Sequence, residues 1–184
     1  GDVITLSSIL PFITRSMVID ATTATGWDIN SGQMVVLDGS ITPNATNGGG
    51  IRISADSVEV YGLHIDGFSP TINLGLYSTG SYNVIGAPGK GNVITNNTQG
   101  ISIVGGDFNS VQGNYIGTDF SLTDLGNNKS GIVLTQGASF NIIGGDDPSE
   151  ANYIYHNGAS SVAPGVDILY NTSVGNQIVG NSMS

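Results

Sequence analysis

The sequence predicts an all-β protein, a right-handed parallel β-helix of about six to seven coils with three short strands in each coil. Two observations support this fold. Short apolar–any–apolar units recur along the chain, and a glycine, an asparagine and a further apolar residue follow each unit in the same order. Units of this length cannot form a sheet alone, but stacked coils pair them from one turn to the next.

The first repeated unit places two apolar residues on one side of a strand, because side chains two residues apart point the same way. Successive copies start 23 to 34 residues apart. The short loops between strands absorb the differences in length, as expected of a solenoid. The five copies begin at Gly50, Asn73, Gly100, Gly131 and Gly165, with Asn73 standing in the glycine position.

Two further apolar positions complete each copy, and we expect both to point into the core. Burial of each such side chain stabilises the fold by roughly 1.5–3 kcal/mol, which offsets the entropy lost in ordering the coil. The first position is occupied by Val60, Val84, Val111, Ile142 and Ile178, and the second by Ile65, Ile94, Ile116, Ile154 and Met183.

Asparagine precedes the last apolar position in four copies, and Leu63 replaces it in the first. A glycine lies a few residues earlier in every copy, which indicates a tight bend. An asparagine at a bend tolerates left-handed backbone geometry, and its amide can donate to and accept from the next coil. The sequence therefore predicts a structural ladder formed by Asn92, Asn114, Asn152 and Asn181.

We expect one β-helix domain over residues 1–184, with irregular coils in 1–50 and regular coils in 51–184. The first residue is not methionine, and no covering segment is evident at either end, so we expect a piece of a longer chain. Open coil ends expose backbone donors and apolar positions. Self-association through these ends is therefore one expected form of partnership.

The charge pattern restricts the expected partners. The formal net charge is −10, with 4 basic residues against 14 acidic ones and no cysteine. Nucleic acid binding needs clustered lysine and arginine, so it is excluded, and acidic polysaccharides are disfavoured by repulsion. No apolar stretch is long enough to predict membrane insertion. Neutral polysaccharides, cations and other proteins remain as partners.

Two segments carry a family resemblance. Residues 113–119, Gly-Asn-Tyr-Ile-Gly-Thr-Asp, lead to Leu125-Gly126-Asn127, and Asn141-Ile142-Ile143-Gly144-Gly145 leads to a second Asn-Tyr-Ile. They resemble the coil signature of bacterial secreted and cell-surface right-handed β-helix repeat proteins, which have the pectin-lyase-like fold. The resemblance implies an extracellular or cell-surface location and a structural or adhesive role. It also implies an alternative, because polysaccharide lyases and glycoside hydrolases share this fold.

The sequence gives weak support to an active site. A lyase would need a basic residue, but Arg52 is expected to be an outward, solvated residue, with Gly75, Ser102, Val133 and Asp167 in its column. A hydrolase would need two facing carboxylates. The weak catalytic candidates are Asp146 and Asp147, for which a turn before Pro148 is the simpler interpretation.

Other candidate sites concern binding. Asp146, Asp147 and Glu150 offer oxygen ligands for Ca²⁺ in one loop. Tyr115 and Tyr153 share an outward column that could stack on neutral sugars or on each other. The remaining residues with site chemistry receive structural interpretations: Tyr82, Phe108 and Phe140 inside the first corner, and His64 and His156 at the surface or in turns, with no metal-binding spacing.

The expected function is that of a non-catalytic extracellular β-helix module with a structural, adhesive or glycan-contacting role. A carbohydrate-active enzyme, or a fragment of one, is the alternative. Two facing carboxylates in a groove would favour the enzyme.

Overall fold

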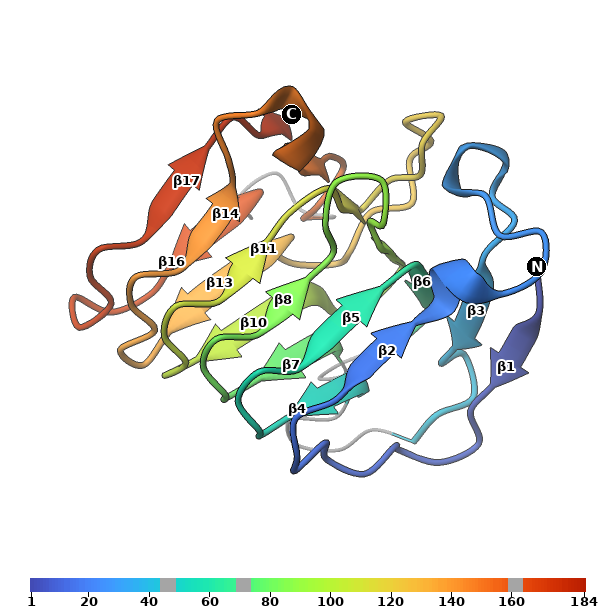
Figure 1. Cartoon of the computed structure of the whole chain (residues 1–184), viewed down its shortest axis with the longest axis horizontal. Coiled ribbons are helices and arrows are strands. Elements are labelled where there is room, and N and C mark those ends of the chain that lie inside the picture. The colour runs from blue at the N-terminus through green and yellow to red at the C-terminus, as the bar shows by residue number, and fades with distance from the viewer. Residues whose placement is uncertain (44–48, 69–73, 159–163) are drawn as a thin grey trace.

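The chain forms a right-handed parallel β-helix of three sheets in a computed structural model that describes residues 1–43, 49–68, 74–158 and 164–184. From β4 onward each coil contributes one strand to each sheet in turn, and all named strands pair in parallel (Figure 1). The predicted fold class is confirmed. Among the described residues, no helix is long and apolar enough to cross a membrane.

Sheet A, the seven-stranded sheet, carries the first and last described strands of the chain. It ends each coil after the short bend that the glycine and asparagine positions form. Its strands, in spatial order, are β1 (Val3–Thr5), β3 (Val35–Asp38), β6 (Leu63–Asp66), β9 (Val93–Thr95), β12 (Tyr115–Ile116), β15 (Tyr153–Ile154) and β18 (Ser182–Met183).

Sheets B and C form the other two walls. Sheet B contains β16 (Val166–Ile168), β13 (Ile132–Thr135), β10 (Gln99–Val104), β7 (Leu74–Ser78) and β4 (Gly49–Ile53). Sheet C contains β17 (Gln177–Val179), β14 (Ile142–Gly144), β11 (Ser110–Val111), β8 (Val84–Ile85), β5 (Glu59–Tyr61) and β2 (Val18–Asp20). Three short 3₁₀ helices lie in loops: η1 (Ala21–Thr23), η2 (Ile29–Ser31) and η3 (Pro148–Glu150).

The core is a set of aliphatic columns inside the three sheets. In sheet A, Ile65 pairs with Ile94, which pairs with Ile116, and Ile116 pairs with Ile154. All four side chains are fully buried. The apolar position predicted to end each coil is therefore confirmed as an inward column. The column loses its cover at the last coil, where Met183 is exposed.

Two members of the sheet C column were predicted at the wrong residue. Val60 pairs with Ile85, and Val111 pairs with both Ile85 and Ile143. The inward residues are therefore Ile85 and Ile143, and the predicted Val84 and Ile142 point outward. Both pairs of neighbours are apolar, so composition cannot distinguish them, and a slip of one residue turns every side chain to the opposite face.

The second copy of the sheet B unit was also predicted two residues too early. Ile51 pairs with Leu76 and Arg52 with Tyr77, so Gly75, not Asn73, occupies the glycine position. The outward neighbour of Arg52 is Tyr77 rather than Gly75. A shift of two residues preserves strand alternation, so the sequence pattern permitted both alignments.

Asparagine side chains connect successive coils at the corner between sheets C and A. The backbone N–H of Asn92 donates to Oδ1 of Asn114 at 3.0 Å, and Asn114 donates in the same way to Asn152 at 3.0 Å. Asn152 donates to Asn181 at 3.1 Å. Each Nδ2 group also donates to the next Oδ1. Leu63 donates its backbone N–H to Asn92 and so begins the ladder.

The other two corners carry asparagine ladders that the sequence analysis missed. Between sheets B and C the ladder runs through Asn83, Asn109, Asn141 and Asn176. Between sheets A and B it runs through Asn97, Asn127 and Asn157. In both ladders the backbone N–H of one asparagine donates to Oδ1 of the next, as at the first corner. In the described residues, all three corners of the β-helix are therefore held by the same interaction.

An aromatic column lies outside the corner between sheets B and C. Tyr82, Phe108 and Phe140 stack with centroids 5.2 Å apart, and they are 58%, 49% and 49% exposed. The prediction that they pack inside is wrong. Each immediately precedes a ladder asparagine and has a positive φ, which turns its side chain outward. Gly175 continues the column, where a Cβ would lie 2.5 Å from the Phe140 ring.

The corrected register of sheet C predicts opposite effects for two adjacent isoleucines. Ile143→Asp places a carboxylate among fully buried aliphatic side chains, so we expect the variant not to fold. Ile142→Asp changes an outward side chain that is 39% exposed, so we expect a folded protein. Circular dichroism and thermal melting measure both. Equal destabilisation by the two substitutions would show that the register is wrong.

The ladder predicts an unusually large effect for one asparagine. Asn114→Ala removes the acceptor for the N–H and Nδ2 groups of Asn92, and the buried donors that remain cost about 2–4 kcal/mol of unfolding free energy. The matched control is Asn171→Ala, because Asn171 is an exposed turn residue. We expect that control to change stability by less than about 0.5 kcal/mol. Chemical denaturation measures both, and a small effect of Asn114→Ala would contradict the ladder's role.

Candidate functional site

The outer face of sheet A is hollowed where three loops border it. One hollow, which we call the aromatic cleft, has a volume of about 400 Å³. Trp27 comes from the loop after β2, and Tyr115 and Tyr153 come from the sheet itself. Its wall is completed by residues of the loops at 28–30, 89–91 and 148–151. The sequence predicted the two tyrosines as a candidate platform but did not place the tryptophan beside them.

Tyr115 and Tyr153 form a parallel stack on adjacent strands. They are register partners, and their rings lie 4.8 Å apart at an interplanar angle of 6°. Both face outward and are half-buried. Burial, with a smaller contribution from Tyr153, raises the pKa of Tyr115. The pair therefore offers a rigid aromatic edge with two hydroxyl groups.

Trp27 is held against the sheet by a polar contact. Its indole Nε1–H donates to the carbonyl of Gly62 at 2.8 Å, across 35 residues of sequence. Asp20 and Asp28 fix the loop that carries it, because their carboxylates accept backbone N–H bonds at the starts of η1 and η2. The backbone N–H of Asn30 lowers the pKa of Asp28, so this carboxylate stays ionised beside the cleft.

The loop of η3 closes the third side of the aromatic cleft. Asp147 Oδ1 accepts hydrogen bonds from the backbone and hydroxyl of Ser149, and Glu150 Oε2 accepts from the Asp147 N–H. These two carboxylates form a capping box. Asp146 is exposed. Among the described residues, no three His, Asp or Glu side chains form a group that could hold a metal ion. The predicted set of Asp146, Asp147 and Glu150 does not form such a group either.

A second hollow of about 260 Å³ adjoins the cleft, and Ile29 lines both. We call it the apolar hollow because Ile29, Met34, Val93, Phe120 and Leu125 line it, together with Ser31, Gly32, Asp119 and Ser121. The imidazole of His64 also lines this hollow. Asp119 anchors the loop that carries Phe120, since its carboxylate accepts bonds from Ser121 and Thr123.

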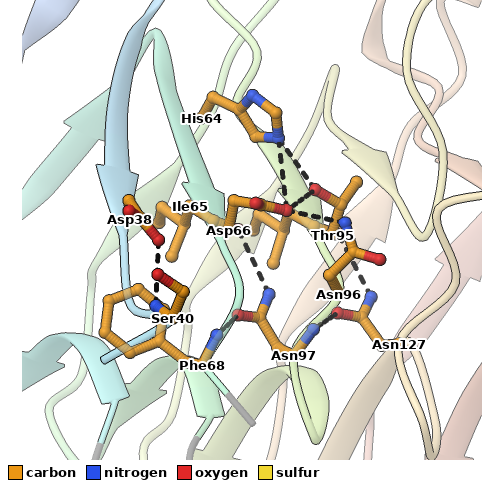
Figure 2. Close-up of polar contacts among 11 residues, drawn as sticks. Asp38, Ser40, His64, Ile65, Asp66, Phe68, Thr95, Asn96, Asn97 and Asn127 are labelled. Atoms are coloured by element: carbon orange, nitrogen blue, oxygen red, sulfur yellow. Dashed lines mark hydrogen bonds and ion pairs between the residues drawn. The ribbon is translucent and has the colours of Figure 1, made fainter. Parts of the chain in front are cut away.

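A chain of hydrogen bonds orients His64 (Figure 2). The Thr95 hydroxyl donates to Asp66 Oδ1 at 2.7 Å, and His64 Nε2 lies 2.8 Å from the same hydroxyl oxygen. A hydroxyl has one hydrogen, so the donor in the second bond must be His64 Nε2–H. Neutral His64 therefore carries its lone pair on Nδ1, which points away from Thr95 and Asp66 in Figure 2.

Burial keeps His64 neutral near physiological pH. Desolvation lowers the pKa of His64, and the charges of Asp66 and Asp119 oppose this shift less strongly. The side chain nevertheless keeps 25% of its surface exposed. His64 therefore lies on the outer face of β6, partly exposed as a surface residue would be, with its ring fixed by the Thr95 hydroxyl. His156 lies at a corner, where its ring contacts the Leu122 carbonyl.

Arg52 differs from its predicted environment. Its guanidinium lies 3.9 Å from the centroid of the Phe12 ring and donates to the Leu10 carbonyl. It is thus packed against the N-terminal segment rather than solvated. The corrected column of Tyr77, Ser102, Val133 and Asp167 contains no second basic residue.

Comparison with known proteins gives no assignment. No family model matches the chain, and no curated protein or solved structure is significantly similar to it.

The hydrogen-bond chain predicts the tautomer of His64. In ¹H–¹⁵N correlation spectra of the imidazole groups at neutral pH, we expect the proton on Nε2 and the lone pair on Nδ1. The sequence has two histidines, so the His64→Phe spectrum identifies the signals. We also expect His64 to titrate below 6.5, because burial disfavours the charged ring. A proton on Nδ1 of neutral His64 would contradict the chain.

Proposed function

We propose that this chain is a non-catalytic, extracellular or cell-surface module that binds neutral glycans at the aromatic cleft. The observation that carries the proposal is the convergence of Trp27, Tyr115 and Tyr153 on one cleft of about 400 Å³. Aromatic rings bury the apolar faces of sugars, and polar groups at their edges bond the hydroxyls. The two tyrosine hydroxyls supply such groups.

The charge of the cleft favours neutral sugars over acidic ones. Asp28 lines it, and its described lining contains no lysine or arginine. The whole chain carries a formal net charge of −10. An acidic polysaccharide would therefore meet repulsion both in the cleft and at a distance.

The carboxylates around the cleft support binding rather than hydrolysis. Glycoside hydrolysis in most families needs two carboxylates facing the bond, about 5–10 Å apart. Asp28 is the one carboxylate in the described cleft lining, and the nearby Asp147 caps η3. The enzyme alternative therefore lacks its required pair here. Self-association through the coil ends stays a prediction, with exposed Ile168, Ile178 and Met183 as its physical basis.

The single tryptophan of the sequence provides a direct assay. Because Trp27 lines the cleft, binding of a neutral oligosaccharide should change its fluorescence, and titration gives the dissociation constant. Isothermal titration calorimetry checks the same constant without the probe. An absence of binding to a panel of neutral oligosaccharides by both methods would overturn the proposal.

Substitution of the tyrosine stack localises the binding site. Tyr153→Ala removes one ring and should weaken glycan binding about tenfold, since an aromatic stacking contact contributes about 0.5–1.5 kcal/mol beyond its buried area. The control is Tyr170→Ala, because Tyr170 is 69% exposed and does not line the cleft. We expect this control to bind like the unmodified protein. Equal affinities of the two variants would place the glycan elsewhere.

A further inference from the structure

We propose that the apolar hollow is a subsite for the acetamido group of an N-acetylated hexosamine, with His64 Nδ1 accepting the amide N–H. This inference rests on the proposed function, because it names the sugar class that the aromatic cleft and its neighbour would bind together. It concerns a site that the sequence did not predict. Three independent features of the hollow match that group.

The first feature is an acceptor of fixed direction. The Thr95 hydroxyl donates to Asp66, so it can only accept from His64, and this leaves Nδ1 without a proton. Nδ1 has no hydrogen-bond partner among the described residues. His64 lines the hollow, and its side chain keeps 25% of its surface exposed. Nδ1 therefore offers a ligand in the hollow an acceptor whose direction is fixed by the Thr95 bond.

The second feature is an apolar wall for a methyl group. Met34, Val93 and Phe120 line the hollow beside His64. A methyl group packed against these three side chains gains from burial, and a hydroxyl in the same place does not. The polar lining residues are His64, Asp119, Ser31 and Ser121. An acetamido group carries both the methyl group and the N–H that the wall and the imidazole select.

The third feature is proximity to a sugar-binding surface. Ile29 lines both the aromatic cleft and the apolar hollow. Val93, in the hollow, is also the register partner of Tyr115, in the cleft. A sugar ring against the tyrosine edge therefore has its substituents next to the hollow. When the imidazole is protonated, Nδ1 becomes a donor. A sugar hydroxyl could then accept a hydrogen bond from it, but an amide N–H could not, because it can only donate.

Two tetrasaccharides with the same linkage test the acetamido group. Chitotetraose carries it on every ring, and cellotetraose carries a hydroxyl there. By Trp27 fluorescence and calorimetry at about pH 7.5, we expect chitotetraose to bind about tenfold more tightly. Equal affinity would overturn the subsite and leave the proposed function standing. If neither tetrasaccharide binds while another neutral glycan does, the subsite alone is wrong, and if no neutral glycan binds, both proposals fall.

Substitution and pH locate the preference at His64. His64→Phe keeps a planar ring but removes the acceptor, so chitotetraose affinity should fall to that of cellotetraose while cellotetraose affinity stays unchanged. A purely structural role would weaken both sugars equally, which would overturn the assignment.

Unmodified protein supplies the second test if that variant does not fold. The groups facing His64 are Asp66 from its own strand and Asp119 from the loop at 118–124. Protonation of His64 converts Nδ1 into a donor, so the preference for chitotetraose should disappear as pH falls through the pKa of His64, which burial lowers. A preference that persists at a pH where the imidazole signals show His64 protonated would contradict the role of Nδ1.

Discussion

The structure depends on hydrogen bonds to stacked asparagines at the three corners of the β-helix. Backbone N–H groups at a corner cannot be satisfied by strand pairing, and here several of them are buried. Asn92, Asn114 and Asn152 are fully buried, and each donates its N–H to the side-chain oxygen of the next coil. An unsatisfied buried donor costs about 1–3 kcal/mol, so the ladder decides whether a tight corner can exist.

The same ladders fix the register of very short strands. Strands β8 and β12 contain only two residues each, too few to set their own alignment. An asparagine immediately precedes each of them, and its bonds to the neighbouring coils hold the alignment. Tyr115 and Tyr153 follow ladder residues directly, so their stacking is a consequence of the ladder. The candidate glycan surface therefore inherits its rigidity from the corners.

Sequence patterns predicted the fold and one corner, because the aliphatic columns and the Asn92 ladder keep their chemistry from coil to coil. They failed where neighbouring residues were chemically alike. Val84 and Ile85 are both β-branched, so a slip of one residue could not be seen. The Asn83 ladder could have been found from Asn83, Asn109, Asn141 and Asn176, each preceding a sheet C strand by a fixed short step.

The candidate site was only partly predictable. Tyr115 and Tyr153 occupy equivalent positions in two coils, so their column could be read from the repeat. Trp27 comes from an irregular loop, and its contact with Gly62 crosses 35 residues of sequence. The environment of His64 depends on Thr95, in the next coil, and on the loop that carries Phe120. Such contacts follow from packing between coils, which the local pattern does not encode.

Backbone hydrogen exchange at the corners tests the central claim most directly. The N–H groups of Asn83, Asn92, Asn97, Asn109 and Asn114 lie in bends, yet each donates to a side-chain oxygen of the next coil. We predict protection equal to that of the central strand amides, because both open only with the coil stack. Exchange at the rate of exposed turn amides, with the strands still protected, would show that the asparagine side chains do not hold the coils together.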